Sequence, residues 1–216
     1  IYFMKLKNLF LLFFTVLYVD SVSQTSDQAE NLLNLVSKQM ESYNNIDFEF
    51  SYVLNNRIEQ INQESSGQVT VAGEKYKLDF LDAIQLFDGK SLYTIVPENE
   101  EITITKTHEV EDFGINPREL LQFYKNGYDY HWDISQRVKG KNIQFVKLIP
   151  VEGDGETESL LVGIETKQNH IYKIIEIGYN GTTTTLTINN MKVNSSLPEN
   201  FFVFKEADYP NYFINR

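Results

Sequence analysis

The sequence has no cysteine, only three histidines and a single tryptophan among 216 residues. Without cysteine the chain forms no disulfide, offers no thiolate to zinc and cannot be lipidated at a signal-peptide cysteine. His108, His131 and His170 are widely separated and match no HExxH spacing. We therefore expect no metal site, and stability must come from burial and hydrogen bonds.

The motifs of common enzyme classes are also missing. The sequence contains no GxSxG elbow, no P-loop and no dinucleotide fingerprint. The acidic stretch at residues 152–158 lacks the order of an EF-hand, so a solvated hairpin loop is the better interpretation. We predict that the protein is not an enzyme and uses no cofactor.

Positive charge is scarce. The chain has 19 Lys and Arg against 30 Asp and Glu, a net charge of −11. Nucleic acids and anionic lipid headgroups are bound through clustered Lys and Arg. The composition therefore predicts no nucleic-acid partner.

The longest apolar run, from Leu9 to Val19, is too short to span a bilayer, which needs about 20 apolar residues. Lys5 and Lys7 precede this run and the small-residue step Ser21-Val22-Ser23 follows it, as in a secretory signal peptide. We predict a signal peptide at residues 1–23, with residues 1–3 as an upstream extension of Met4. Because no cysteine is available for lipidation, the exported domain at residues 24–216 is expected to be free in the periplasm and not membrane-anchored.

The remaining chain has the composition of a folded, mainly β domain. Hydrophobic residues make up 42% and aromatic residues 13%, with 15 Phe and 13 Tyr. Residues 26–43 carry apolar side chains at spacings of three and four, which predicts a helix capped by Ser26 or Asp27. From Asp47 onward the apolar period is two, which is typical of half-buried strands.

The alternation recurs along the chain and predicts one antiparallel sheet, curled or sandwiched. Asp88-Gly89 has the composition of a tight turn between two of the strands. Asn116-Pro117 followed by helix-forming residues predicts a short helix at residues 116–124 that plugs or covers the sheet. The strands are expected at residues 47–52, 67–71, 76–80, 101–105, 142–149, 160–167, 171–179 and 183–193.

Two strands place large apolar residues on both faces, at residues 92–96 and 171–175. Either two layers of the fold are buried or one face of the sheet binds an apolar ligand. Buried aromatic residues usually serve packing, so the plain core interpretation stays open at this point.

The order of segments resembles the periplasmic outer-membrane lipoprotein carrier family LolA, particularly its divergent Bacteroidetes-like members. The resemblance covers nearly all of residues 26–210 and is most specific at Asp88-Gly89-Lys90 with Leu92-Tyr93 and Pro97. The matching segments read NIDFEFSY, SGQVTVAGEKYKLDF, FDGKSLYTIVPENEEITI, NPRELLQFY and LPENFFVFKEADYP.

This resemblance implies a single curved antiparallel sheet that forms an unclosed half-barrel, covered by an N-terminal helix and a short lid helix. It also implies a carrier that receives acylated lipoproteins from an inner-membrane lipoprotein-releasing ABC transporter and passes them to an outer-membrane acceptor, if one is present. Such carriers work as monomers. Strand parity then places the acyl-chain cavity at Phe48, Phe50, Val69, Val71, Leu78, Phe80, Ile95, Ile102 and Ile104, and the lid at Arg118, Leu120, Leu121 and Phe123.

The chain departs from the family pattern at one position. Members commonly carry an Arg shortly after the second strand that binds the lid, whereas this stretch reads Ala72-Gly73-Glu74-Lys75. Lys75 or Arg118 is the expected replacement. The missing lipidation cysteine also favours the carrier over the anchored acceptor of related fold.

Three alternatives stay open on the sequence. The first is a carrier or sensor of another lipid or hydrophobic ligand on the same half-barrel. The second is a structural or interaction protein with a filled core, and the third is an enzyme whose cleft cannot be assembled from the residues.

Overall fold

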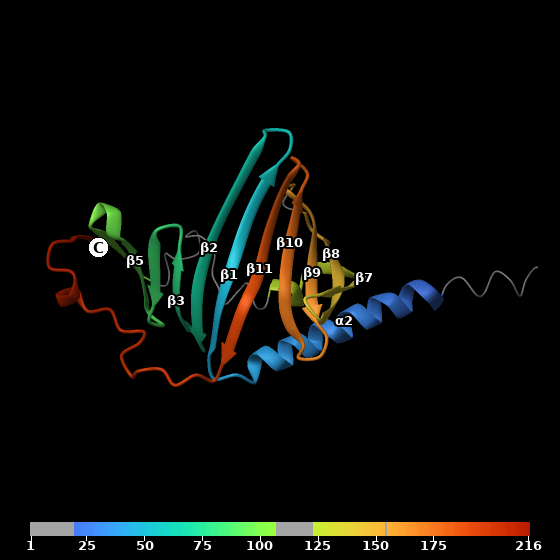
Figure 1. Cartoon of the computed structure of the whole chain (residues 1–216), viewed down its shortest axis with the longest axis horizontal. Helices are drawn as coiled ribbons and strands as arrows, with labels where there is room; N and C mark the ends of the chain where they lie inside the picture. Colours follow the sequence, from blue (N-terminus) through green and yellow to red (C-terminus); the bar gives the residue numbers. More distant parts are fainter. Residues whose placement is uncertain (1–19, 107–122, 154) are drawn as a thin grey trace, which may run out of the picture.

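In the computed structural model, residues 20–106, 123–153 and 155–216 are described, and they form one sheet of 12 strands (Figure 1). The strand order is β12-β6-β5-β4-β3-β2-β1-β11-β10-β9-β8-β7, so the sheet has two ends and is not closed into a barrel. All neighbours pair antiparallel except β12, which runs parallel to β6. The expected open antiparallel sheet is thus confirmed. The strands are β1 (Ile46–Asn56), β2 (Ile61–Ala72), β3 (Lys75–Phe80), β4 (Ala83–Phe87), β5 (Ser91–Val96), β6 (Glu101–Lys106), β7 (Tyr128–Val138), β8 (Lys141–Pro150), β9 (Thr157–Glu165), β10 (His170–Gly178), β11 (Thr182–Val193) and β12 (Phe213–Asn215).

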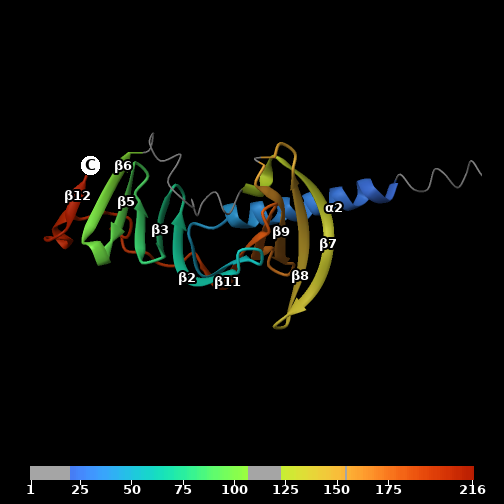
Figure 2. The ribbon, with the colours of Figure 1, turned by 90° about the horizontal axis from the view of Figure 1, so that it is seen from above.

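The sheet consists of two meanders joined through its centre. β1 pairs with β2 on one side and with β11 on the other, so the first strand lies in the middle of the sheet. Seen from above, the strands curve into a trough, with α2 (Asp20–Glu41) on the concave side of the β7 to β11 half (Figure 2). Three short 3-10 helices complete the described elements: η1 (Pro97–Asn99), η3 (Phe123–Lys125) and η4 (Glu206–Asp208).

Helix α2 forms because its apolar residues recur on one stripe. That stripe is buried and faces β7, β10 and η3. The expected helix is confirmed, but it begins at Asp20, upstream of the predicted caps Ser26 and Asp27. The stripe consists of Ala29, Leu32, Leu33, Val36 and Met40.

The turn between β4 and β5 follows its sequence. The Asp88 side chain accepts hydrogen bonds from the backbone N–H groups of Lys90 and Ser91, both at 2.8 Å. Gly89, which follows Asp88 directly, has φ +98°, a conformation that L side chains rarely adopt. The predicted tight turn is therefore confirmed.

Beyond β11 the chain crosses to the other side of the sheet. Residues 195–212, called the C-terminal segment here, lie against the convex face of β3 to β5. Phe204 stacks on Tyr93 with ring centroids 4.4 Å apart, and Tyr209 stacks on Phe204 at 5.6 Å. The segment leads into β12, which pairs with the edge strand β6 and covers it.

Candidate functional site on the concave face

An aromatic cluster lines the concave face of β1, β3 and β4. Register places Phe48 opposite Val69, and Val69 opposite Leu78, so these three side chains share one face of three adjacent strands. Phe80 contacts both neighbouring rings of β1, with centroids 5.3 Å from Phe50 and 5.4 Å from Tyr52. The aromatic half of the concave face consists of Phe48, Phe50, Tyr52, Tyr76, Phe80 and Phe87.

Gly67 makes room for this cluster. It lies on β2 between Phe50 and Phe80 in the register. A Cβ at Gly67 would lie 2.5 Å from Cζ of Phe50 and 2.7 Å from the carbonyl oxygen of Asp79. The missing side chain therefore lets the Phe50 ring lie flat over the strand, where any other residue would displace it.

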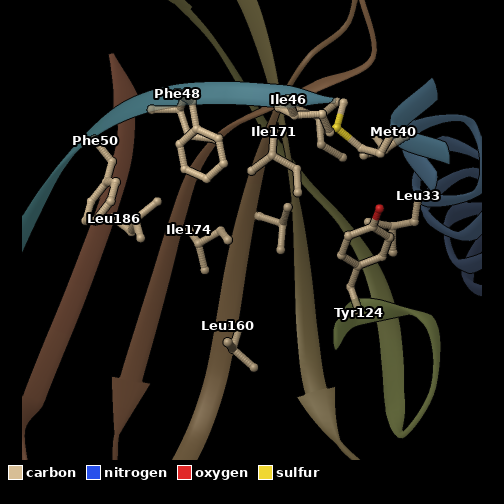
Figure 3. Close-up of a cluster of buried hydrophobic side chains, with 14 of the residues drawn as sticks. Leu33, Met40, Ile46, Phe48, Phe50, Tyr124, Leu160, Ile171, Ile174 and Leu186 are labelled. Carbon is tan, nitrogen blue, oxygen red and sulfur yellow. The ribbon is translucent and has the colours of Figure 1, made fainter. Parts of the chain in front are cut away.

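The other half of the concave face is aliphatic and is covered by α2. Figure 3 shows Leu33 of α2 beside the ring of Tyr124 of η3, and Met40 of α2 beside Ile46 of β1. Tyr124 is 1% exposed, and burial raises the pKa of its hydroxyl, with the nearby Glu41 carboxylate adding to the shift. The aliphatic side chains of β8 to β10 in this cluster are Val146, Leu148, Leu160, Val162, Ile164, Ile171 and Ile174.

The apolar side of the sheet changes between β3 and β6. Register places Phe87 opposite Leu92 on the concave side, and Leu92 opposite Thr105. The next pair on the concave face, two residues further along each strand, is Gln85 with Thr94. Toward β6 the concave face thus becomes polar, while the apolar side chains of the same strands point to the convex face.

This reversal corrects three of the expected cavity residues. Ile95 pairs with Ile84 and Ile102, and Ile84 pairs with Asp79, which places the row on the face opposite Phe48. Ile104 pairs with Tyr93 and lies on that convex face as well. Residues 92–96 carry apolar side chains on both faces, and the prediction assigned the wrong face to the cavity, because the C-terminal segment covers the face of Ile95 as a second apolar layer.

The other six expected residues are brought together. Phe48, Phe50, Val69, Val71 and Leu78 are buried in one cluster, and Phe80 packs against it. The expected cavity residues did not include Tyr76 and Phe87. Tyr76 could have been found from the sequence, because it lies on the same strand face as Leu78 and Phe80. The shared face is established by register, while binding at it stays a prediction.

The predicted lid falls mostly outside the described residues, which resume at η3. Arg118, Leu120 and Leu121 lie in that gap, and nothing is described of the Phe123 side chain. The described end of this stretch is held to α2 by an ion pair between Lys125 and Glu41. The hydrogen bond and charge of Lys125 lower the pKa of Glu41.

The convex layer gives a first prediction. Ile95 is 2% exposed and lines a cavity of about 210 Å³ between the sheet and the C-terminal segment. Ile95→Ala removes buried methyl groups and is expected to lower the free energy of unfolding by about 2–4 kcal/mol, measured by urea titration. Thr94→Ala, on the concave side of the same strand, is the control, with an expected loss of less than about 1 kcal/mol. Equal losses would contradict the convex packing.

A polar cluster holds the end of α2 to the sheet. The hydroxyl of Tyr43 lies 2.7 Å from Nε2 of His170, and the Gln39 amide donates to that hydroxyl at 2.7 Å. Asn45 exchanges two hydrogen bonds of 2.9 Å with the backbone of Ser195. The junction between α2 and β1 is thereby tied to the point where the chain leaves β11.

The imidazole in this cluster predicts a pH dependence. Burial lowers the pKa of His170, with Glu165 opposing the shift and Lys141 adding to it. The unfolded chain therefore takes up this proton more readily, so stability is full above the ordinary pKa of 6.5 and falls as the pH drops below it. His170→Gln should flatten the profile of unfolding free energy from pH 7 to 5, whereas the exposed His131→Gln should not. An unchanged slope in His170→Gln would refute this origin.

Other kinds of site are not found in the described ranges. Among residues 20–106, 123–153 and 155–216, no group of three or more His, Asp or Glu side chains is placed to hold a metal ion. Within the same ranges, no helix has the length and apolar character needed to cross a membrane. The apolar concave face is the candidate site because it gathers the aromatic and aliphatic side chains described above.

The sequence pattern of the family described as outer membrane lipoprotein carrier protein LolA matches residues 22–178, well over half of the chain. The chain belongs to this LolA family. The matched stretch includes the helix, the aromatic half and most of the aliphatic half of the concave face. The description of the family is that of a carrier, which is a class of binding protein.

One solved structure supports the fold with a TM-score above 0.5, and two others are similar at lower scores. A conserved protein from Thermus thermophilus aligns with a TM-score of 0.54 at 12% identity, over 84% of this chain and 96% of that one. A LolA superfamily protein from Nitrosomonas europaea aligns at 0.43 and 10% identity, over 83% and 98%. An outer membrane lipoprotein-sorting protein domain from Vibrio parahaemolyticus aligns at 0.44 and 10%, over 82% and 97%. No curated protein gives a significant match.

Proposed function

We propose that this LolA family member is a periplasmic carrier that binds the acyl chains of lipoproteins and ferries them from the inner to the outer membrane. The observation that supports this most is the aromatic half of the concave face, which gathers six Phe and Tyr side chains on three strands. Among the described residues, no group of His, Asp and Glu side chains is placed to hold a metal ion.

The free energy of exposing acyl chains to water explains why lipoproteins need a carrier with an apolar surface. Each buried methylene contributes about 0.8 kcal/mol, so one long acyl chain in water costs on the order of 10 kcal/mol. Three chains on one lipoprotein do not leave a membrane unless an apolar surface receives them. The concave face carries apolar side chains that can serve as such a surface once the groups covering them move aside.

The same face must also release its cargo. Phe48 and Leu78 are buried in the described structure, so acyl chains reach them only when covering groups move. Cargo and covering groups then compete for one apolar surface, and a partner shifts the balance by binding one of the two states. Energy enters upstream at the transporter, which is the expected source of the cargo.

The test is a release assay. Spheroplasts or vesicles that carry a triacylated lipoprotein and the cognate inner-membrane transporter are incubated with the purified protein. Soluble lipoprotein in complex with the protein is the expected result. If no lipoprotein is released but another lipid copurifies, the cargo is a different hydrophobic ligand. If neither is bound, the carrier function is refuted.

A further inference from the structure

Three hairpin tips at one end of the sheet expose large apolar side chains. Ile58, in the turn from β1 to β2, is 77% exposed. Tyr179, in the turn from β10 to β11, is 67% exposed, and Val151, after β8, is 62% exposed. We call residues 57–60, 151–153, 155–156 and 179–182 the hairpin rim. The turns at Ile58 and Tyr179 stand together at the top of Figure 1, at the end opposite α2.

The rim is held in place by a buried side chain. Asn56 is 4% exposed, and its amide donates to Oγ1 of Thr182 at 2.9 Å. Its side-chain oxygen accepts the backbone N–H groups of Ile58 and Glu59 at 2.9 and 3.0 Å. One buried amide thus orders the first turn and fastens it to the second.

Further contacts involve all three tips. A Cβ at Gly181 would lie 2.8 Å from Cδ1 of Ile58, so the isoleucine is seated directly over the neighbouring turn. The backbone N–H of Tyr179 donates to the carbonyl oxygen of Glu156 at 3.0 Å. The N–H of Val151 donates to Gly127 at 2.9 Å, just before β7. The exposed side chains of Ile58 and Tyr179 therefore project from two turns in direct contact, and Glu156 joins the second of these turns to the start of β9.

Single exposed apolar residues are common, but a grouped and ordered set marks an interaction surface. The charges of the rim indicate which kind of partner this surface would bind. Glu59, Glu152 and Glu156 are exposed beside the apolar tips, and Arg57 is the basic residue of the described rim. An acidic edge is repelled by anionic lipid headgroups and is complementary to a protein surface that carries Lys and Arg.

We propose that the hairpin rim docks on a basic, partly apolar surface of the inner-membrane transporter that delivers the cargo. This inference rests on the proposed function, because every cargo molecule has to be collected from that transporter. The apolar tips provide the contact area, and the acidic side chains orient the carrier. The cargo face remains a separate surface, lined by the aromatic cluster.

The experiment separates docking from cargo binding. A rim variant with Ile58→Ser, Val151→Ser and Tyr179→Ser is compared with a control variant with Leu81→Ser, Val203→Ser and Phe213→Ser, at three other exposed apolar positions. Each full-length protein is tested for lipoprotein collection from transporter-containing vesicles and for direct binding of a synthetic triacylated lipopeptide. The rim variant should collect at least tenfold less lipoprotein and bind the lipopeptide normally, and the control should do both.

A charge variant tests the electrostatic part. Glu59→Lys with Glu152→Lys should reduce collection and its sensitivity to salt, whereas Glu98→Lys with Glu199→Lys should not. Unchanged collection by both rim variants would overturn docking at the rim and leave the carrier function intact. Failure of the wild-type protein to bind the lipopeptide would overturn the carrier function, and the rim proposal with it.

A lipid bilayer is the other surface to which the rim could bind, and a separate experiment distinguishes it from the transporter. Vesicles of phosphatidylethanolamine and phosphatidylglycerol without the transporter are sedimented with the wild-type protein and the rim variant. Neither should cosediment. Cosedimentation of the wild-type protein that is lost in the rim variant would overturn the protein partner in favour of a lipid surface.

Discussion

Phe50→Asp is expected to reduce lipoprotein collection at least tenfold. The Phe50 ring is 5% exposed and packs against Phe80 over Gly67, at the centre of the aromatic half. A carboxylate at this position is either buried without a partner or draws water into the apolar face, and both disfavour acyl chains. The measurement is the amount of soluble lipoprotein complex formed from transporter-containing vesicles.

The control lies one residue further along the same strand. Ser51 pairs with Ser66 and Thr187 on the opposite face of the sheet, so Ser51→Asp adds the same charge away from the cargo surface. It should leave collection unchanged. Because Phe50→Asp also strains the core, Phe80→Asp serves as a second variant at a half-buried position, with folding checked by circular dichroism. Full collection by a folded Phe80→Asp protein would contradict binding at the aromatic half.

Val36→Asp is expected to cause the largest loss of stability. Val36 has 0% exposure in the middle of the apolar stripe by which α2 covers the aliphatic half. A charge there has to be buried unpaired, or the helix has to leave the sheet. The free energy of unfolding should fall by at least about 3 kcal/mol in urea titration.

The neighbouring residue supplies the comparison. Leu35 is 50% exposed on the same helix, and Leu35→Asp should change the free energy of unfolding by less than about 1 kcal/mol. Similar losses in the two variants would mean that α2 does not cover the sheet through its Val36 stripe.

The strands around β1 could be predicted because they bury apolar side chains on the concave face alone. Apolar and polar residues therefore alternate along their sequences. Phe48 and Phe50, with Leu78 and Phe80 two strands away, were assigned to one face from parity, and the register confirms that face. Parity failed at Ile95 because β4 to β6 are packed on their convex side. The covering residues come from the distant C-terminal segment, which no local pattern connects to these strands.

The aliphatic half was not predicted for a different reason. Ile171 and Ile174 both face the core although they are three residues apart, because the register shifts between Ile171 and Lys173. Such a bulge breaks the period of two on which the interpretation of strands depends. Tyr124 was placed in a lid helix by its sequence context, whereas the structure places it in η3 and buries it in the core cluster beside α2.

The central position of β1 also governs how the chain reaches its native state. Each meander closes through hairpins between strands adjacent in sequence, which form rapidly because their loops are short. The pairing of Ile46 with Val193 joins positions near opposite ends of the domain. That joint closes the largest loop in the sheet, so we expect it to form last and to set the folding rate. Until β11 has arrived, the Phe-rich strand keeps an unpaired edge, and the newly made chain remains a target for aggregation or for holding chaperones.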